Sequence, residues 1–175
     1  MSGTDPVTPV FPAGSGPLPA DFDAWVQAPF TFLTSKVVFR AQLQGGMSLS
    51  AGENIVPYDT ILEDPYSGWN SGTSQWTCPA GCSGWYGVTM TAWSNSAGIN
   101  TDLIESVLYL NGSVYQECSG DWGVNGHATG SSGSVPISLY GGQDAISGSI
   151  FSSAAVGVPT TNGQYPSIEV CWLCL

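Results

Sequence analysis

The alternation of hydrophobic and polar residues predicts strands along most of the chain after residue 35. Apolar side chains recur at every second position in 37–43 and again in 85–93. A period of two residues is typical of a strand that buries one face. Further runs of this kind occupy 103–110, 114–117, 135–139, 145–151 and 168–175. We therefore expect at least seven short strands in this part of the chain.

Turn signals separate these strands. Asn111-Gly112 directly follows the 103–110 run and is the strongest short hairpin signal in the sequence. Gly141-Gly142 and Asn162-Gly163 mark further turns. Gly130-Ser131-Ser132-Gly133 is also expected to be a loop. Short strands without intervening helices predict an all-β protein, an antiparallel sandwich or barrel.

Residues 1–36 have a different pattern. Prolines and glycines punctuate 1–20, which predicts an extended arm. Asp21 can cap a short helix over 21–33, broken near Pro29. Its apolar stripe is our candidate contact surface with a particle or a neighbouring subunit, although the helix packing back on its own domain stays an alternative. The stripe consists of Phe22, Trp25, Val26, Phe30 and Leu33. We thus divide the chain into a docking segment, 1–36, and a β head, 37–175.

Composition narrows the function. The chain has two basic residues, one histidine and 13 carboxylates, with a formal net charge of -11. Acid–base catalysis and phosphate handling draw mainly on His, Lys and Arg, so we predict no enzyme, no catalytic residues and no cofactor. Nucleic acid and anionic membranes need basic patches and are not expected partners. The N-terminus does not resemble a signal peptide, which predicts synthesis in a cytoplasm.

Five cysteines leave three readings open. Cys78 and Cys82 are close in sequence, as are Cys171 and Cys174, whereas Cys118 stands apart. They could be buried free thiols, include a Cys78–Cys82 disulfide, or bind zinc together. Against zinc, alternation along 168–175 places Cys171 and Cys174 on opposite faces of one strand. We predict no metal site.

A few other residues are candidates for binding or chemistry. Trp69 and Trp122 are possible glycan contacts, and Trp122 is expected in a turn. Calcium ligands could come from Asp59, Glu63 and Asp64, or from Asp121 with Asp144, although no ligand loop of known spacing is present. His127, in a Gly/Ser-rich stretch, is read as polar surface rather than as a catalytic base.

Several motifs together resemble the jelly-roll head of the complement globular-head and tumour-necrosis-factor-like family. The resemblance rests on their order along 37–175 rather than on any one of them. The motifs are Val37-Val38-Phe39-Arg40-Ala41, Val56-Pro57-Tyr58-Asp59, Trp69-Asn70, Trp76-Thr77-Cys78-Pro79, Gly84-Trp85-Tyr86-Gly87-Val88, Leu108-Tyr109-Leu110-Asn111-Gly112 and Leu139-Tyr140-Gly141-Gly142-Gln143-Asp144. The resemblance implies an antiparallel jelly-roll sandwich that forms a homotrimer.

The N-terminal part resembles another group. Phe11-Pro12-Ala13-Gly14, Asp21 to Val26 and Phe30 to Arg40 are similar to the start of minor virion proteins of tailed phages with actinobacterial hosts. This resemblance implies a virion component, a capsid decoration or tail appendage, that contacts major capsid or tail proteins. The competing hypotheses are a lectin-like tail tip that recognises host cell-wall glycan and, more remotely, a glycan hydrolase.

Overall fold

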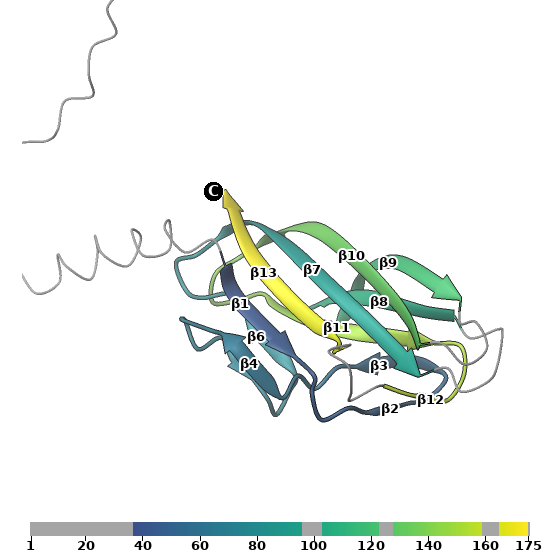
Figure 1. Ribbon diagram of the computed structural model, residues 1–175. Coiled ribbons are helices and arrows are strands. Elements are labelled where there is room, and N and C mark those ends of the chain that lie inside the picture. The colour runs from purple at the N-terminus through teal and green to yellow at the C-terminus, as the bar shows by residue number, and fades with distance from the viewer. Residues whose placement is uncertain (1–36, 96–102, 123–127, 159–164, 175) are drawn as a thin grey trace, which may run out of the picture. The chain divides into compact units, whose positions relative to one another are not determined.

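The computed structural model describes residues 37–95, 103–122, 128–158 and 165–174. The predicted arm and helix, His127 and the Asn162-Gly163 turn lie outside these ranges. Within them the chain forms thirteen strands in two sheets, and every strand pair is antiparallel (Figure 1). No helix in the described part of the chain is long and apolar enough to cross a membrane.

We call the two layers sheet A and sheet B. Sheet A has the order β2-β12-β7-β13-β1-β4, and β10 pairs with the edge of β7 opposite to β13. Its strands are β1 (Val37–Gln42), β2 (Ser48–Leu49), β4 (Thr60–Glu63), β7 (Gly84–Asn95), β10 (Ala128–Leu139), β12 (Val156–Gly157) and β13 (Ser167–Cys174). Sheet B has the order β5-β6-β11-β8-β9, with β3 also paired to β11. Its strands are β3 (Gly52–Ile55), β5 (Trp69–Asn70), β6 (Gln75–Thr77), β8 (Leu103–Leu110), β9 (Ser113–Trp122) and β11 (Ala145–Ser152).

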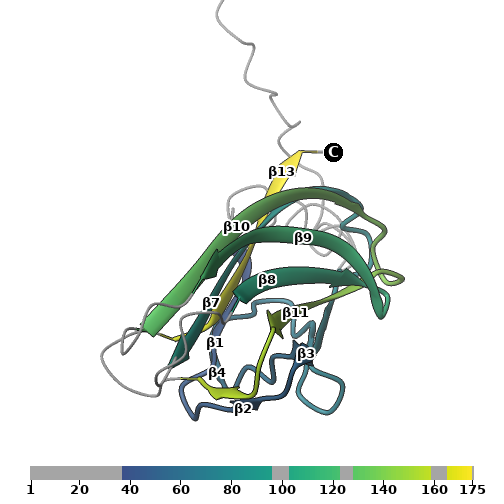
Figure 2. The ribbon, with the colours of Figure 1, turned by 90° about the vertical axis from the view of Figure 1, so that its right-hand side faces the viewer.

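The two sheets face each other as curved layers (Figure 2) and enclose the core. The strand order makes this an all-β jelly-roll sandwich, as predicted. The central strands follow the expected alternation, since Tyr86, Val88, Met90 and Ala92 of β7 are all buried. On the facing sheet, β8 and β11 contribute Ile104, Leu108, Ile146 and Ile150 to the same core.

Strand lengths differ from the sequence prediction in β9 and β10. The expected loop Gly130–Gly133 is wrong, because β10 begins at Ala128 and pairs with β7 along its whole length. Trp122 is likewise not in a turn but at the end of β9, opposite Leu103. The long ladder with β7 supplies backbone hydrogen bonds that outweigh the weak strand propensity of serine and glycine.

Aromatic side chains fill the part of the core between β1 and β6. Phe39 and Trp76 are fully buried and stack with ring centroids 5.9 Å apart. The ring of Trp69 stacks on the same Phe39 at 5.4 Å, and Tyr58 meets Trp69 edge-on. Trp76 in turn meets Tyr86 of β7 edge-on at 6.2 Å. This cluster joins the two sheets.

The predicted Asn111-Gly112 hairpin is confirmed, and side-chain hydrogen bonds of Asn111 anchor it. Asn111 has φ 52°, and its side chain donates to Asp144 Oδ1 at 2.8 Å and accepts from Ala145 N at 2.9 Å. Asn111→Ala would lose both bonds and strain the turn, so we expect about 2 kcal/mol of destabilisation in urea unfolding. Asn111→Gly is the matched control, because it relieves the strain and isolates the loss of the bonds. Equal stability of wild type and Asn111→Ala would contradict this anchoring role.

Candidate subunit interface

The outward face of sheet A carries a regular set of side chains that the core does not explain. Along β7, β10 and β13, alternate residues point into the core and the residues between them point away from it. The outward set on β7 is Trp85, Gly87, Thr89, Thr91 and Trp93. The outward set on β10 is Ser132, Ser134, Pro136 and Ser138, and on β13 it is Ser167, Glu169, Cys171 and Leu173. We call these residues the A face.

Strand register aligns the A face in rows across the strands. Ser132 lies opposite Thr91, which lies opposite Ser167, and Ser134 lies opposite Thr89. Hydroxyl groups bond along these rows, with 2.8 Å between Thr89 Oγ1 and Ser134 Oγ and 2.8 Å between Thr91 Oγ1 and Ser167 Oγ. These short hydroxyl side chains bond to one another along the rows and make the face regular.

The next row has a glycine at its centre. Gly87 lies between Pro136 on β10 and Cys171 on β13, and a Cβ on Gly87 would be in ordinary contact with the Leu173 side chain. At this end of the sheet the exposed apolar residues gather: Trp85 is 46% exposed and Leu173 54%. Tyr140, directly after β10, is 65% exposed. An apolar end beside a face of hydroxyl side chains with one charged residue, Glu169, suits contact with another protein surface.

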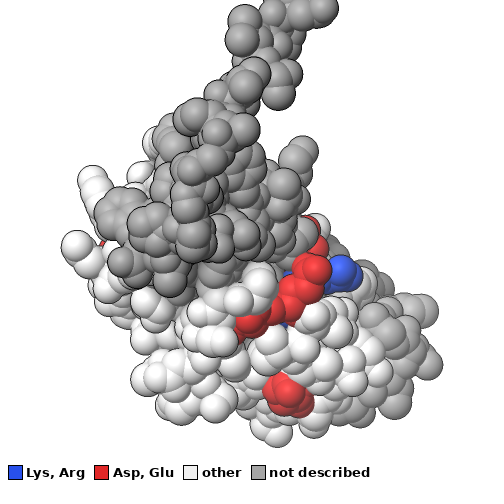
Figure 3. All heavy atoms as spheres, turned by 90° about the vertical axis from the view of Figure 1, so that its left-hand side faces the viewer, with Lys and Arg blue, Asp and Glu red and all other residues white. Residues whose placement is uncertain are grey.

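The strands of sheet A carry three charged residues, Arg40 of β1, Glu63 of β4 and Glu169 of β13, and Glu169 lies on the A face opposite Thr89. Arg40 of β1 lies 3.6 Å from Glu169 of β13 and opposite Glu63 of β4. The view of Figure 3 shows this arrangement, with basic atoms beside acidic atoms on a largely uncharged surface. Burial raises the pKa of the Cys171 thiol to about 11, and the neighbouring carboxylates of Glu169 and Glu63 add to the rise. The outward positions of β7 and β10 carry no charged residue.

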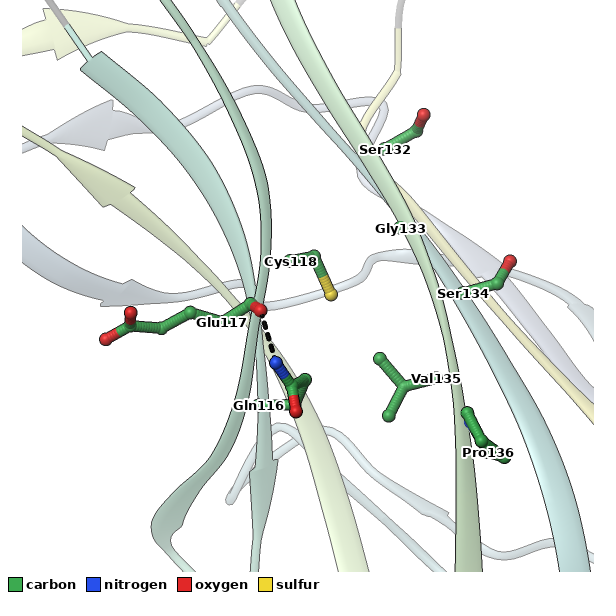
Figure 4. Close-up of a pocket in the computed structure, with 8 residues that line it drawn as sticks. All are labelled: Gln116, Glu117, Cys118, Ser132, Gly133, Ser134, Val135 and Pro136. Atoms are coloured by element: carbon green, nitrogen blue, oxygen red, sulfur yellow. Dashed lines mark hydrogen bonds between the residues drawn. The ribbon is translucent and has the colours of Figure 1, made fainter.

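A pocket of about 310 Å³ lies where β9 and β10 run side by side at the open edge of the sandwich (Figure 4). Gln116, Glu117 and Cys118 line it from β9, and the segment 132–136 lines it from β10. Gly133 fits only because it has no side chain, since a Cβ there would clash with Cys118. Burial raises the pKa of the Cys118 thiol. The Cys118 side chain faces the pocket, the Glu117 carboxylate points away from it, and the pocket borders the outward serines of β10.

Of the residues that the sequence suggested as glycan or docking contacts, the structure describes the side chain of Trp69 only. Trp69 is half-buried, and one face of its ring is taken by Phe39. The side chain of Trp122 and the predicted contact residues Phe22, Trp25, Val26, Phe30 and Leu33 lie outside the described part. Their roles stay predictions.

Two of the carboxylates considered as calcium ligands, Asp59 and Asp64, accept hydrogen bonds from loop backbone. Asp59 accepts from Gln44 N and Gly45 N, at 2.8 and 2.6 Å, and these bonds hold its pKa below the usual value although its partial burial acts in the opposite direction. Asp64 accepts from Gly68 N and Trp69 N, both at 2.9 Å. Among the described residues, no group of three or more His, Cys, Asp or Glu side chains is placed to hold a metal ion.

Comparisons with known proteins agree with this architecture. No protein-family model matches the chain, and no curated protein sequence matches it significantly. The fold resembles that of solved jelly-roll domains. The globular domain of zebrafish complement 1qA is 15% identical, with a TM-score of 0.57, over 77% of this chain and 95% of that one. Eiger TNF from S. frugiperda is 12% identical, with a TM-score of 0.55, over 79% of this chain and 94% of that one. Murine APRIL is 11% identical, with a TM-score of 0.57, over 77% and 98%.

Proposed function

We propose that this chain is a non-enzymatic structural module that works as a homotrimer, with the A face as its subunit contact. The observation that carries the proposal is the uncharged, regular face formed by the outward residues of β7 and β10 with an apolar end at Trp85 and Leu173. Interface centres are depleted of charge and enriched in aromatic residues. The jelly-roll fold shared with complement and tumour-necrosis-factor proteins supports a trimer, since the family resemblance of the sequence implies one.

We further propose that the trimer is a component of a phage virion, a capsid decoration or tail appendage. This part rests on the resemblance of 11–40 to minor virion proteins of tailed phages and on the apolar stripe from Phe22 to Leu33. In this proposal residues 1–36 dock the protein to a capsid or tail protein, and the β head is displayed. The chain has only two basic residues, which suits a protein on a particle surface that does not bind nucleic acid or membranes.

Light scattering on the size-separated full chain, together with particle incorporation, tests both parts. We expect a mass of about three chains of 18.2 kDa each. A chain lacking residues 1–34 should stay folded and trimeric but no longer enter particles, because the head keeps its A face and loses its docking segment. A monomeric full chain would reject the trimer, and normal incorporation of the truncated chain would reject the docking segment.

A further inference from the structure

The segment after β6 brings two cysteines to one turn. Cys78 follows β6, and Cys82 N donates to Pro79 O at 3.1 Å across the turn between them. Gly81 takes φ +79° at the third turn position, as a type II turn requires. Cys78 is fully buried, whereas Cys82 is partly exposed. The turn therefore places one thiol inside the domain and the other at its surface.

The buried thiol points back at the other cysteine. Cys78 Sγ lies 3.3 Å from the carbonyl oxygen of Cys82 and 3.4 Å from Tyr86 Oη. Tyr86 Oη in turn donates to that same Cys82 carbonyl. Cys78 Sγ is therefore in contact with the backbone of Cys82, so the two side chains start from neighbouring positions.

Neighbouring turns hold the backbone of this segment in place. Gly142 N donates to Cys78 O at 2.7 Å, and Cys78 N donates to Asp144 O at 2.9 Å. Gly141 N donates to Ser83 Oγ at 3.0 Å. A side chain at Gly141 would collide with Pro79 O and Cys82 N, so the two turns are in direct contact. The cysteine backbones are thus fixed close to each other before any bond forms.

We propose that Cys78 and Cys82 form an intramolecular disulfide when the folded protein meets a low-molecular-weight disulfide such as oxidised glutathione. The Cys82 thiolate attacks the glutathione disulfide, forms a mixed disulfide and releases one reduced glutathione. The Cys78 thiolate then attacks the Cys82 sulfur and displaces the second reduced glutathione. Each thiol gives up one proton, and the protein pair loses two electrons to the glutathione disulfide.

Two features of the site set the order and the rate of this reaction. Cys82 reacts first because it is the more exposed of the two thiols. Burial raises the pKa of both thiols, and the neighbouring Asp144 carboxylate adds to the rise at Cys78. The thiolate fraction at neutral pH is therefore small, and the reaction should be faster at higher pH. The crosslink closes the turn that packs against the end of the A face, next to Trp85 and Tyr140.

The test uses the full chain with Cys118, Cys171 and Cys174 replaced by serine, so that only this pair remains. The folded protein is incubated with oxidised glutathione, and free thiols are then counted after unfolding. Pepsin is used for peptide mapping because Lys36 and Arg40 are the only trypsin sites. We expect both thiols to disappear, the mass to fall by two hydrogen atoms, and one crosslinked peptide to span 78–82. The matched control, which also carries Cys82→Ser, should keep its Cys78 thiol free.

Three results would overturn the proposal. In the first, both thiols stay free in the folded protein under conditions that fully oxidise the urea-unfolded chain. In the second, glutathione stays attached to Cys82, which would mean that the Cys78 thiolate does not reach the Cys82 sulfur. In the third, Cys82 links separate chains into dimers that run apart on a non-reducing gel. Circular dichroism of both variants establishes that each is folded before oxidation.

Discussion

Ser134→Arg is expected to convert the trimer into folded monomers. Ser134 is exposed on the outward side of β10 and bonds to Thr89 in the middle of the A face. An arginine there would bury a charge in each subunit contact, and the one carboxylate in its row, Glu169 on β13, lies beyond Thr89 and already pairs with Arg40. Burying an unpaired charge costs several kcal/mol. We therefore expect the dissociation constant to rise at least about 100-fold, measured by sedimentation velocity over a concentration series.

Ser71→Arg is the matched control for this experiment. Ser71 is exposed in the turn between β5 and β6 of sheet B, away from the A face, and receives the same change of side chain. Exposed substitutions of this kind change stability by about 0.5 kcal/mol or less, so assembly should be unchanged. If Ser134→Arg stays trimeric at the same concentrations as Ser71→Arg, the A face is not the subunit contact.

Local sequence signals predicted the hairpin and the central strands but not the full length of sheet A. Asn111-Gly112 was predictable because its backbone conformation depends on the two residues themselves. The segment 128–134 was not, because its serines and glycines favour loops and only pairing with β7 makes them a strand. Trp122 was misplaced for a similar reason, since Gly120 and Asp121 suggest a turn whereas pairing with β8 extends β9 through them.

The A face could not have been found from periodicity alone. Its serines, threonines and glycines occur on strands that are distant in sequence, and strand register brings them together. A signal was present in the outward positions of 85–93 and 132–138, which contain no charged residue. In a strand exposed to water such positions usually hold charged or long polar side chains. Because only 9% of the residues in the whole chain are charged, missing charge alone would not have located the surface.

Trp76→Ala is expected to be the most destabilising single substitution proposed here. Trp76 is fully buried, stacks on Phe39 and meets Tyr86 edge-on, so it connects β6 of sheet B with β1 and β7 of sheet A. Removing a buried tryptophan side chain leaves a cavity that the surrounding sheets cannot close, at a cost of about 3–5 kcal/mol. Urea unfolding should be measured on the Ser134→Arg background, so that assembly does not contribute to the result.

Trp85→Ala provides the contrast within the same background. Trp85 is 46% exposed on the A face, and its removal should lower the free energy of unfolding of the monomer by about 1 kcal/mol or less. In the protein that retains Ser134 the same change should weaken assembly, because a large aromatic side chain buried in an interface contributes much of its binding energy. Equal destabilisation of the monomer by Trp76→Ala and Trp85→Ala would contradict the assignment of Trp76 to the core and of Trp85 to the surface. The two substitutions therefore distinguish the contacts that stabilise each head from the contacts that join one head to another.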